Sequence, residues 1–190
     1  STEIIPQYFK NTPDFGRGVS VTVSKNADLL GQTYLYVKLP GIALETHSTL
    51  PSGVKKFAWI KKIGLGIVRF VDLEIGGTLI DRQYGDWINI WLELTQTKSK
   101  KRGIDKMIGD VKQLTDFSNG KDSYAVTIPL PFWFSNNYGI SLPLVSLVHS
   151  DIKFHVEFND INLCYKESPN HYLEVNNFFC LFEKNEYFTQ

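Results

Sequence analysis

Alternation of apolar and polar residues at every second position constrains the fold of this chain more than any other feature. In residues 152–158 the even positions are Ile, Phe, Val and Phe, whereas the odd positions are Lys, His and Glu. Val19, Val21 and Val23 alternate with hydroxyl side chains, and residues 34–39 alternate again before the turn pair Pro40-Gly41. Because successive side chains of a strand point to opposite faces, this pattern predicts half-buried β-strands.

Further strands are expected along the rest of the chain. The apolar stretch 57–80 predicts strands at about 65–70 and 71–76, a turn at Gly76-Gly77 and a short piece ending at Ile80. Others are predicted at 123–129, 142–148, 152–163 and 172–183, with loops at 42–56 and 115–122. The last strand is nearly continuous in Phe and Leu, which indicates burial on both faces or contact with another subunit. Aromatic residues at 14% also favour sheet.

The apolar period changes between Tyr84 and Leu94. There apolar residues recur at spacings of three and four, which predicts an amphipathic helix. We expect Trp87 and Trp91, one turn apart, to be buried against the edge of the sandwich, and Asp81 or Asp86 to cap the helix start. Residues 97–102 are predicted to be a basic loop, and residues 104–114 a second short helix.

These elements predict an all-β fold. About eight antiparallel strands with long connections are best accommodated by an eight-stranded jelly-roll sandwich with one or two helices in the inter-strand connections. The chain has 190 residues and a mass of 21.7 kDa, which suits a single domain over residues 1–190. Its formal net charge is zero, so nothing draws it as a whole toward nucleic acid or an anionic membrane. We expect no transmembrane segment and no secretory signal.

No familiar catalytic set is present in the sequence. The four histidines, His47, His149, His155 and His171, contain no His-x-His pair for a cupin-type metal site. Gly64-Leu65-Gly66 lacks the third glycine of a dinucleotide motif, and Gly76-Gly77 has no Lys-Ser/Thr behind it. Asp72 with Glu74, or Asp81 with Asp86, are the nearest approach to a carboxylate pair. We therefore expect no catalytic, cofactor-binding or metal-ligating residue and no enzymatic activity.

Two other features have both a binding and a structural interpretation. The cluster from Lys98 to Arg102 could contact phosphates, but no aromatic side chain is interleaved for base stacking, and a solvated loop is favoured. Trp133 could be a platform for a sugar, but two prolines and three consecutive aromatics in 129–134 favour a plug at one end of the sandwich.

Cys164 and Cys180 lie in apolar surroundings and are expected to be buried, unpaired thiols.

Several long segments resemble the major capsid proteins of nucleocytoplasmic large DNA viruses, with the phycodnavirus and mimivirus-like branch the most similar. The resemblance runs in order from about residue 8 to about 160. Its segments are Asp14–Leu30, Tyr34–Pro40, Trp59–Gly64, Val71–Thr95, Met107–Gly109, Pro129–Phe134 and Gly139–Leu144. The chain departs from the family at Val148-His149-Ser150, where a Gln-Tyr-His stretch is usual, and it shows one jelly roll where the family has two.

The resemblance implies a shell protein. It implies homotrimers that form pseudo-hexagonal capsomers, contacts with neighbouring capsomers and minor capsid proteins, no specific nucleic acid, and a place in the virion after assembly in the host cytoplasm. It also implies that residues 1–190 are the N-terminal half of a double jelly roll, and that the two cysteines stay reduced. Two alternatives remain open: a carbohydrate-binding β-sandwich for host attachment, and a single-jelly-roll vertex or minor capsid protein.

Overall fold

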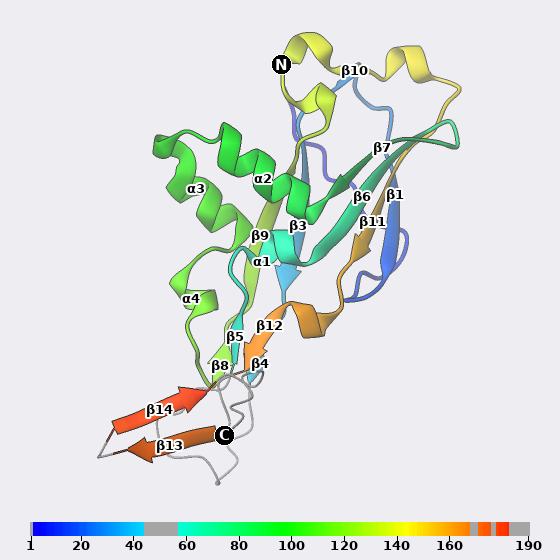
Figure 1. Cartoon of the computed structure of the whole chain (residues 1–190). Coiled ribbons are helices and arrows are strands. Elements are labelled where there is room, and N and C mark those ends of the chain that lie inside the picture. The colour runs from blue at the N-terminus through cyan, green and yellow to red at the C-terminus, as the bar shows by residue number, and fades with distance from the viewer. Residues whose placement is uncertain (1, 44–56, 168–170, 176–177, 183–190) are drawn as a thin grey trace.

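A computed structural model describes residues 2–43 and 57–167, together with the backbone of two strands near the C-terminus. Its largest sheet has four antiparallel strands in the order β1-β11-β6-β7. These strands are β1 (Gly18–Thr22), β6 (Val68–Ile75), β7 (Thr78–Tyr84) and β11 (Ile152–Phe158). Beside them in Figure 1 runs a second ladder, in which β3 (Thr33–Leu39) pairs with β9 (Tyr124–Leu130).

Shorter antiparallel ladders extend both ends of the fold. β2 (Leu29–Leu30) pairs with β10 (Leu142–Pro143), β4 (Ile42–Ala43) with β8 (Gly120–Lys121), and β5 (Phe57–Trp59) with β12 (Tyr165–Glu167). β13 (His171–Val175) pairs with β14 (Phe178–Phe182). The fold is thus antiparallel and mostly β, as predicted. The count of eight strands stays a prediction, because several expected strands are divided into short pieces.

One apolar core joins the two main layers. Alternate residues of β11 and β6 point inward, and Val71, Leu73 and Ile152 have no exposed surface. Val126 and Ile128 of β9 meet them from the opposite layer within the same cluster. Because every second residue of each strand enters this cluster, the alternation predicted for residues 19–23, 34–39 and 152–158 is confirmed.

Helices cover one side of this sandwich (Figure 1). They are α1 (Ile63–Gly66), α2 (Gly85–Thr95), α3 (Lys98–Ile108) and α4 (Lys112–Thr115), and three of them lie between β7 and β8. Short 3₁₀ turns add Trp133–Ser135, Tyr138–Ile140, Val145–Leu147 and Ile161–Leu163. The expected one or two helices therefore underestimate the helical content of the connections.

Several predicted boundaries are wrong. Residues 65–76 do not form two strands: α1 ends at Gly66 and one strand, β6, runs to Ile75, because β6 pairs on both sides and its apolar run continues through Phe70 and Val71. The predicted strand 142–148 is β10 followed by a 3₁₀ turn, since Pro143 supplies no ladder donor. The predicted strand 152–163 stops at Phe158. The predicted strand 172–183 is instead two paired strands, β13 and β14. Their side chains, and residues 44–56 of the predicted loop, lie outside what the structure describes.

Candidate functional site

The candidate functional features of this chain are surfaces. Within residues 2–43 and 57–167 no three His, Cys, Asp or Glu side chains gather closely enough to hold a metal ion. His155 is bound to Glu74, with 3.0 Å between Nε2 and Oε2, and His149 lies on a separate turn. His47 and the side chain of His171 lie outside the part that the structure describes.

The outer face of the four-stranded sheet carries a bidentate ion pair. Nε and Nη2 of Arg82 on β7 donate to the two carboxylate oxygens of Asp72 on β6, at 2.6 and 2.7 Å. The guanidinium carbon also lies 4.2 Å from the centre of the Phe70 ring. The hydrogen bond to Asp72 is the main reason that the pKa of Arg82 is raised above its ordinary value. This geometry fixes both side chains, because a bidentate fork allows one orientation.

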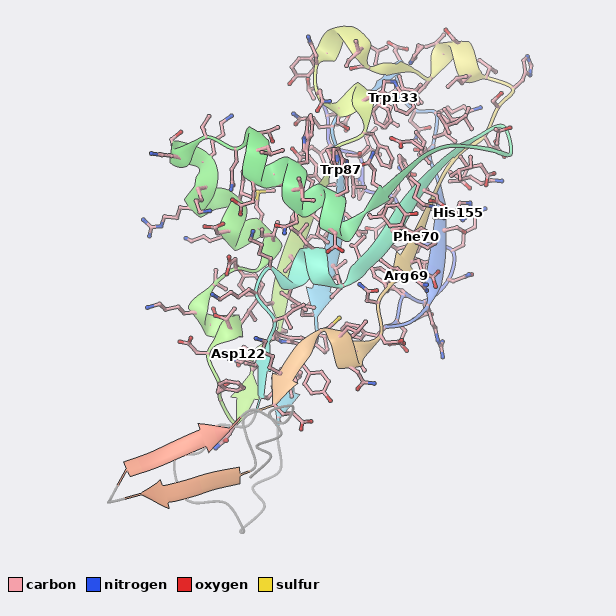
Figure 2. The ribbon with its side chains drawn as sticks, viewed as in Figure 1. Arg69, Phe70, Trp87, Asp122, Trp133 and His155 are labelled. Carbon is pink, nitrogen blue, oxygen red and sulfur yellow. The ribbon has the colours of Figure 1, made fainter. Side chains whose placement is uncertain are left out.

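Next to this pair, charges alternate across the strands. Glu74 accepts from His155 and lies 3.6 Å from the ammonium of Lys153, both on β11. A shallow hollow of about 350 Å³ opens over the same face, and Arg82, His155 and Glu157 are among its lining residues. Figure 2 shows Phe70 and His155 on this sheet. In the sequence, Asp72 and Glu74 stood out only as a possible carboxylate pair. The alternating polar positions of strands β6 and β11 were the signal for a cross-strand network.

Helix α2 approaches the body of the domain through a glycine. A Cβ added at Gly85 would lie 2.6 Å from the carbonyl oxygen of Leu65 and closer still to that of Val68. Ile88, one turn later, is completely buried, and Leu92 packs partly against the core. The side of α2 that carries Gly85, Ile88 and Leu92 therefore faces the core.

This orientation corrects the prediction for the tryptophans. Trp87 is 45% exposed, and Trp91 is only partly buried, with the two ring centres 6.1 Å apart. The physical reason is the close approach at Gly85, which turns the helix so that the tryptophans lie on its flank. The predicted cap is also wrong: the helix has no side-chain cap, and Asp81 accepts instead from the backbone of Arg82 and the amide of Gln83.

The basic cluster is helical. Residues 98–102 form the first half of α3 and are exposed, so the predicted loop is wrong although the prediction of solvation is confirmed. The physical reason is that Lys and Arg have good helix propensity, so a run of basic residues can form a solvated helix as well as a loop. Lys101 lies 3.7 Å from Glu93 of α2, and Glu93 also accepts a hydrogen bond from Lys62. That hydrogen bond first, and then the nearby lysine charges, lower the pKa of Glu93.

The aromatic segment at the end of β9 is a plug with one exposed ring. Phe132 and Phe134 are buried and stack at 5.6 Å, whereas Trp133 between them is 40% exposed. Figure 2 shows Trp133 among the 3₁₀ turns at one end of the molecule. The hollow at this end encloses only about 30 Å³ and is not lined by Trp133. A sugar ring needs far more room, so this hollow is too small to enclose one.

Cys164 is buried and unpaired, as predicted. Burial, and after it the charge of Asp160, raises the pKa of its thiol to about 11. A neutral thiol of this kind is a poor nucleophile, which indicates a packing role. The side chain of Cys180 lies beyond the described residues.

Comparison with known proteins agrees with the fold. The sequence model described as "Major capsid protein N-terminus" matches residues 1–179. The chain belongs to this family. It is 42% identical to "Probable capsid protein 4" of Acanthamoeba polyphaga mimivirus, over 100% of this chain and 37% of that protein. It is 37% identical to the "Major capsid protein" of Phaeocystis pouchetii virus, over 85% of this chain and 35% of that protein.

Solved structures of capsid proteins share its jelly-roll fold. The structure titled "Faustovirus major capsid protein" matches with a TM-score of 0.69 at 9% identity, over 90% of this chain and 45% of that one. A chain of "PBCV-1 virus capsid, quasi-atomic model" matches with a TM-score of 0.63 at 23% identity, over 82% and 34%. The chain thus spans little more than a third of the length of the curated relatives described above. In the residues that the structure describes, no helix is long and apolar enough to cross a bilayer.

Proposed function

We propose that this chain is a structural, non-enzymatic building block of the icosahedral shell of a large DNA virus. The observation that carries the proposal is the family match over residues 1–179. The jelly-roll fold supports it, because such sandwiches are used repeatedly for viral capsids. Large apolar side chains left exposed on α2 and at the end near Trp133 also support it, since extended apolar surface marks protein–protein contact.

We further propose that residues 1–190 are the N-terminal jelly roll of a double jelly roll, and that three copies form a pseudo-hexagonal capsomer. The family description as an N-terminus supports this, as does coverage of 37% and 35% of the two viral relatives. Three chains with two lobes each have six lobes, which suits a lattice with six neighbours. Neighbouring capsomers and minor capsid proteins are the partners proposed, in a virion assembled in the host cytoplasm, with no specific nucleic acid.

Two mass measurements test these proposals. The intact mass of the protein from purified particles is expected to be about twice 21.7 kDa or more. The native mass of the same full-length protein is expected to be three times its chain mass. A mature chain of 21.7 kDa contradicts the double jelly roll and favours a vertex or minor capsid protein. A protein that stays monomeric at all concentrations contradicts the trimer. Specific binding on a glycan array by a protein that is scarce in particles favours a carbohydrate-binding module.

A further inference from the structure

The rotation of helix α2 is fixed from two sides. Gly85 and Ile88 hold one side of it against the domain. On an adjoining side, Lys62 donates hydrogen bonds to Asn89 at 2.8 Å and to Glu93 at 2.5 Å. A helix held by both packing and hydrogen bonds has little freedom to turn. The remaining flank is therefore presented outward in a defined orientation.

That flank is apolar, and we call it the tryptophan ridge. Its members follow one another at helical spacing: Trp87, Ile90, Trp91 and Leu94. Trp87, Ile90 and Leu94 are 45%, 51% and 77% exposed, and nothing among the described residues covers them. Figure 2 shows Trp87 on α2, away from Trp133 at the end of the molecule.

The ridge has the size and composition of an interface core. A large aromatic side chain has roughly 150–250 Å² to bury, so a half-exposed one offers about 100 Å². Trp87, Ile90 and Leu94 together then offer on the order of 300–350 Å², within the range of the largest apolar patches that monomers expose. A standard interface needs about 800 Å² from each partner, so these three side chains supply roughly 40% of that area. Tryptophan is also among the residues that dominate binding energy.

We propose that the tryptophan ridge is the contact through which one copy of this chain docks on the next copy within the capsomer. The inference rests on the proposed function, because a shell subunit is surrounded by copies of itself. A ring of three requires a heterologous contact, in which the ridge meets a different patch of its neighbour. The ridge lies on one flank of the domain and on a helix whose orientation is fixed, which suits such a contact because the backbone needs no ordering on docking.

A matched pair of leucine variants tests the ridge in the full-length protein. Leu94→Ala removes an apolar side chain from the ridge, and Leu79→Ala removes one from β7 that is 53% exposed but lies off the helix. Trp87→Ala is the stronger ridge variant. We expect Trp87→Ala to raise the dissociation constant of the capsomer by about 30-fold or more, and Leu79→Ala to leave it unchanged. Circular dichroism should show all three variants folded, because none of these side chains is buried.

The two levels of the proposal fail in different ways. If the unaltered protein does not oligomerise, the proposed function is contradicted. If it oligomerises and the ridge variants assemble as tightly as Leu79→Ala, only the ridge is contradicted.

A photo-crosslinking residue at position 90, in a mixture of ¹⁴N- and ¹⁵N-labelled protein, identifies the molecule that contacts the ridge. Crosslinked pairs of mixed isotope support a second copy and locate the receiving patch. Crosslinked pairs of one isotope only, adducts with another protein, or no adducts would overturn the proposal that a second copy covers the ridge.

Discussion

Gly85 is the residue through which α2 comes closest to the body of the domain, and replacing it with alanine tests whether this approach fixes the helix. The added Cβ would lie 2.6 Å from the carbonyl oxygen of Leu65 and closer to that of Val68, whereas real Cβ atoms essentially never come within 3.0 Å of such a neighbour. Both obstacles are backbone atoms, at the end of α1 and the start of β6. Neither can rotate away as a side chain would, so α2 itself must shift.

The magnitude follows from what that shift uncovers. Overpacking at a closed site typically costs about 1–3 kcal/mol. Partial exposure of Ile88, whose full burial contributes roughly 1.5–3 kcal/mol, adds to this cost. Alanine in a helix is otherwise favoured over glycine by up to about 1 kcal/mol, which offsets part of it. We expect Gly85→Ala to lower the free energy of unfolding by about 2–3 kcal/mol.

Gly103→Ala is the matched control. Gly103 lies within α3, and an added Cβ there meets nothing within 4 Å. The same substitution should therefore raise the free energy of unfolding by roughly 0.5–1 kcal/mol through helix propensity alone. Urea denaturation followed by circular dichroism and tryptophan fluorescence measures both variants. If Gly85→Ala is as stable as the unaltered protein, the close approach does not fix α2, and the explanation for the exposed tryptophans fails.

Two further predictions concern the sheet face and the buried thiol. Arg82→Met leaves the largely buried carboxylate of Asp72 without its bidentate partner and should lower the free energy of unfolding. Lys153→Met removes one 3.6 Å ion pair and should lower it by less than Arg82→Met does. Equal effects of the two substitutions in thermal denaturation would contradict the assigned roles. Cys164 should resist a thiol reagent at pH 8 until the protein unfolds. Folding raises the pKa of Cys164 from 9.0 to about 11, so the contribution of the neutral thiol to stability is complete below pH 9 and is lost as pH rises through 11. The unaltered protein should therefore lose more stability between pH 9 and pH 11 than Cys164→Ala does, and equal losses would refute this assignment.

Prediction from the sequence was most accurate where the burial of one face of an element is enough to decide its structure. The alternation in β11 is unambiguous, because Ile152, Phe154, Val156 and Phe158 are all buried. Prediction failed where a contact between elements decides. The spacing in α2 reveals an apolar side that is wider than its contact with the core, but which part of that side docks is set by the approach of Gly85 to Leu65 and Val68. No local pattern contains that information.

Segments that are rich in charge, or that a proline interrupts, were the other source of wrong predictions. Residues 97–102 are so basic that a solvated loop was preferred, yet lysine and arginine propagate a helix well when its other face, here through Ile108, is buried. In residues 142–148 the apolar run suggested a strand, but Pro143 interrupts the ladder and a 3₁₀ turn follows. The contacts of Glu74 with His155 and Lys153 join strands that are distant in sequence, so these partners became visible only in the fold.

Absolute protein quantification of purified virus particles tests the central claim most directly. Peptides from residues 2–43 and 57–167 are measured against isotope-labelled standards, alongside the other particle proteins. If the chain builds the shell, its gene product is the most abundant protein of the particle in molar terms, and it is lost together with the outer shell when capsids are dissociated. If the product is absent from particles, or present only in the low copy number of a vertex or attachment protein, the claim is contradicted.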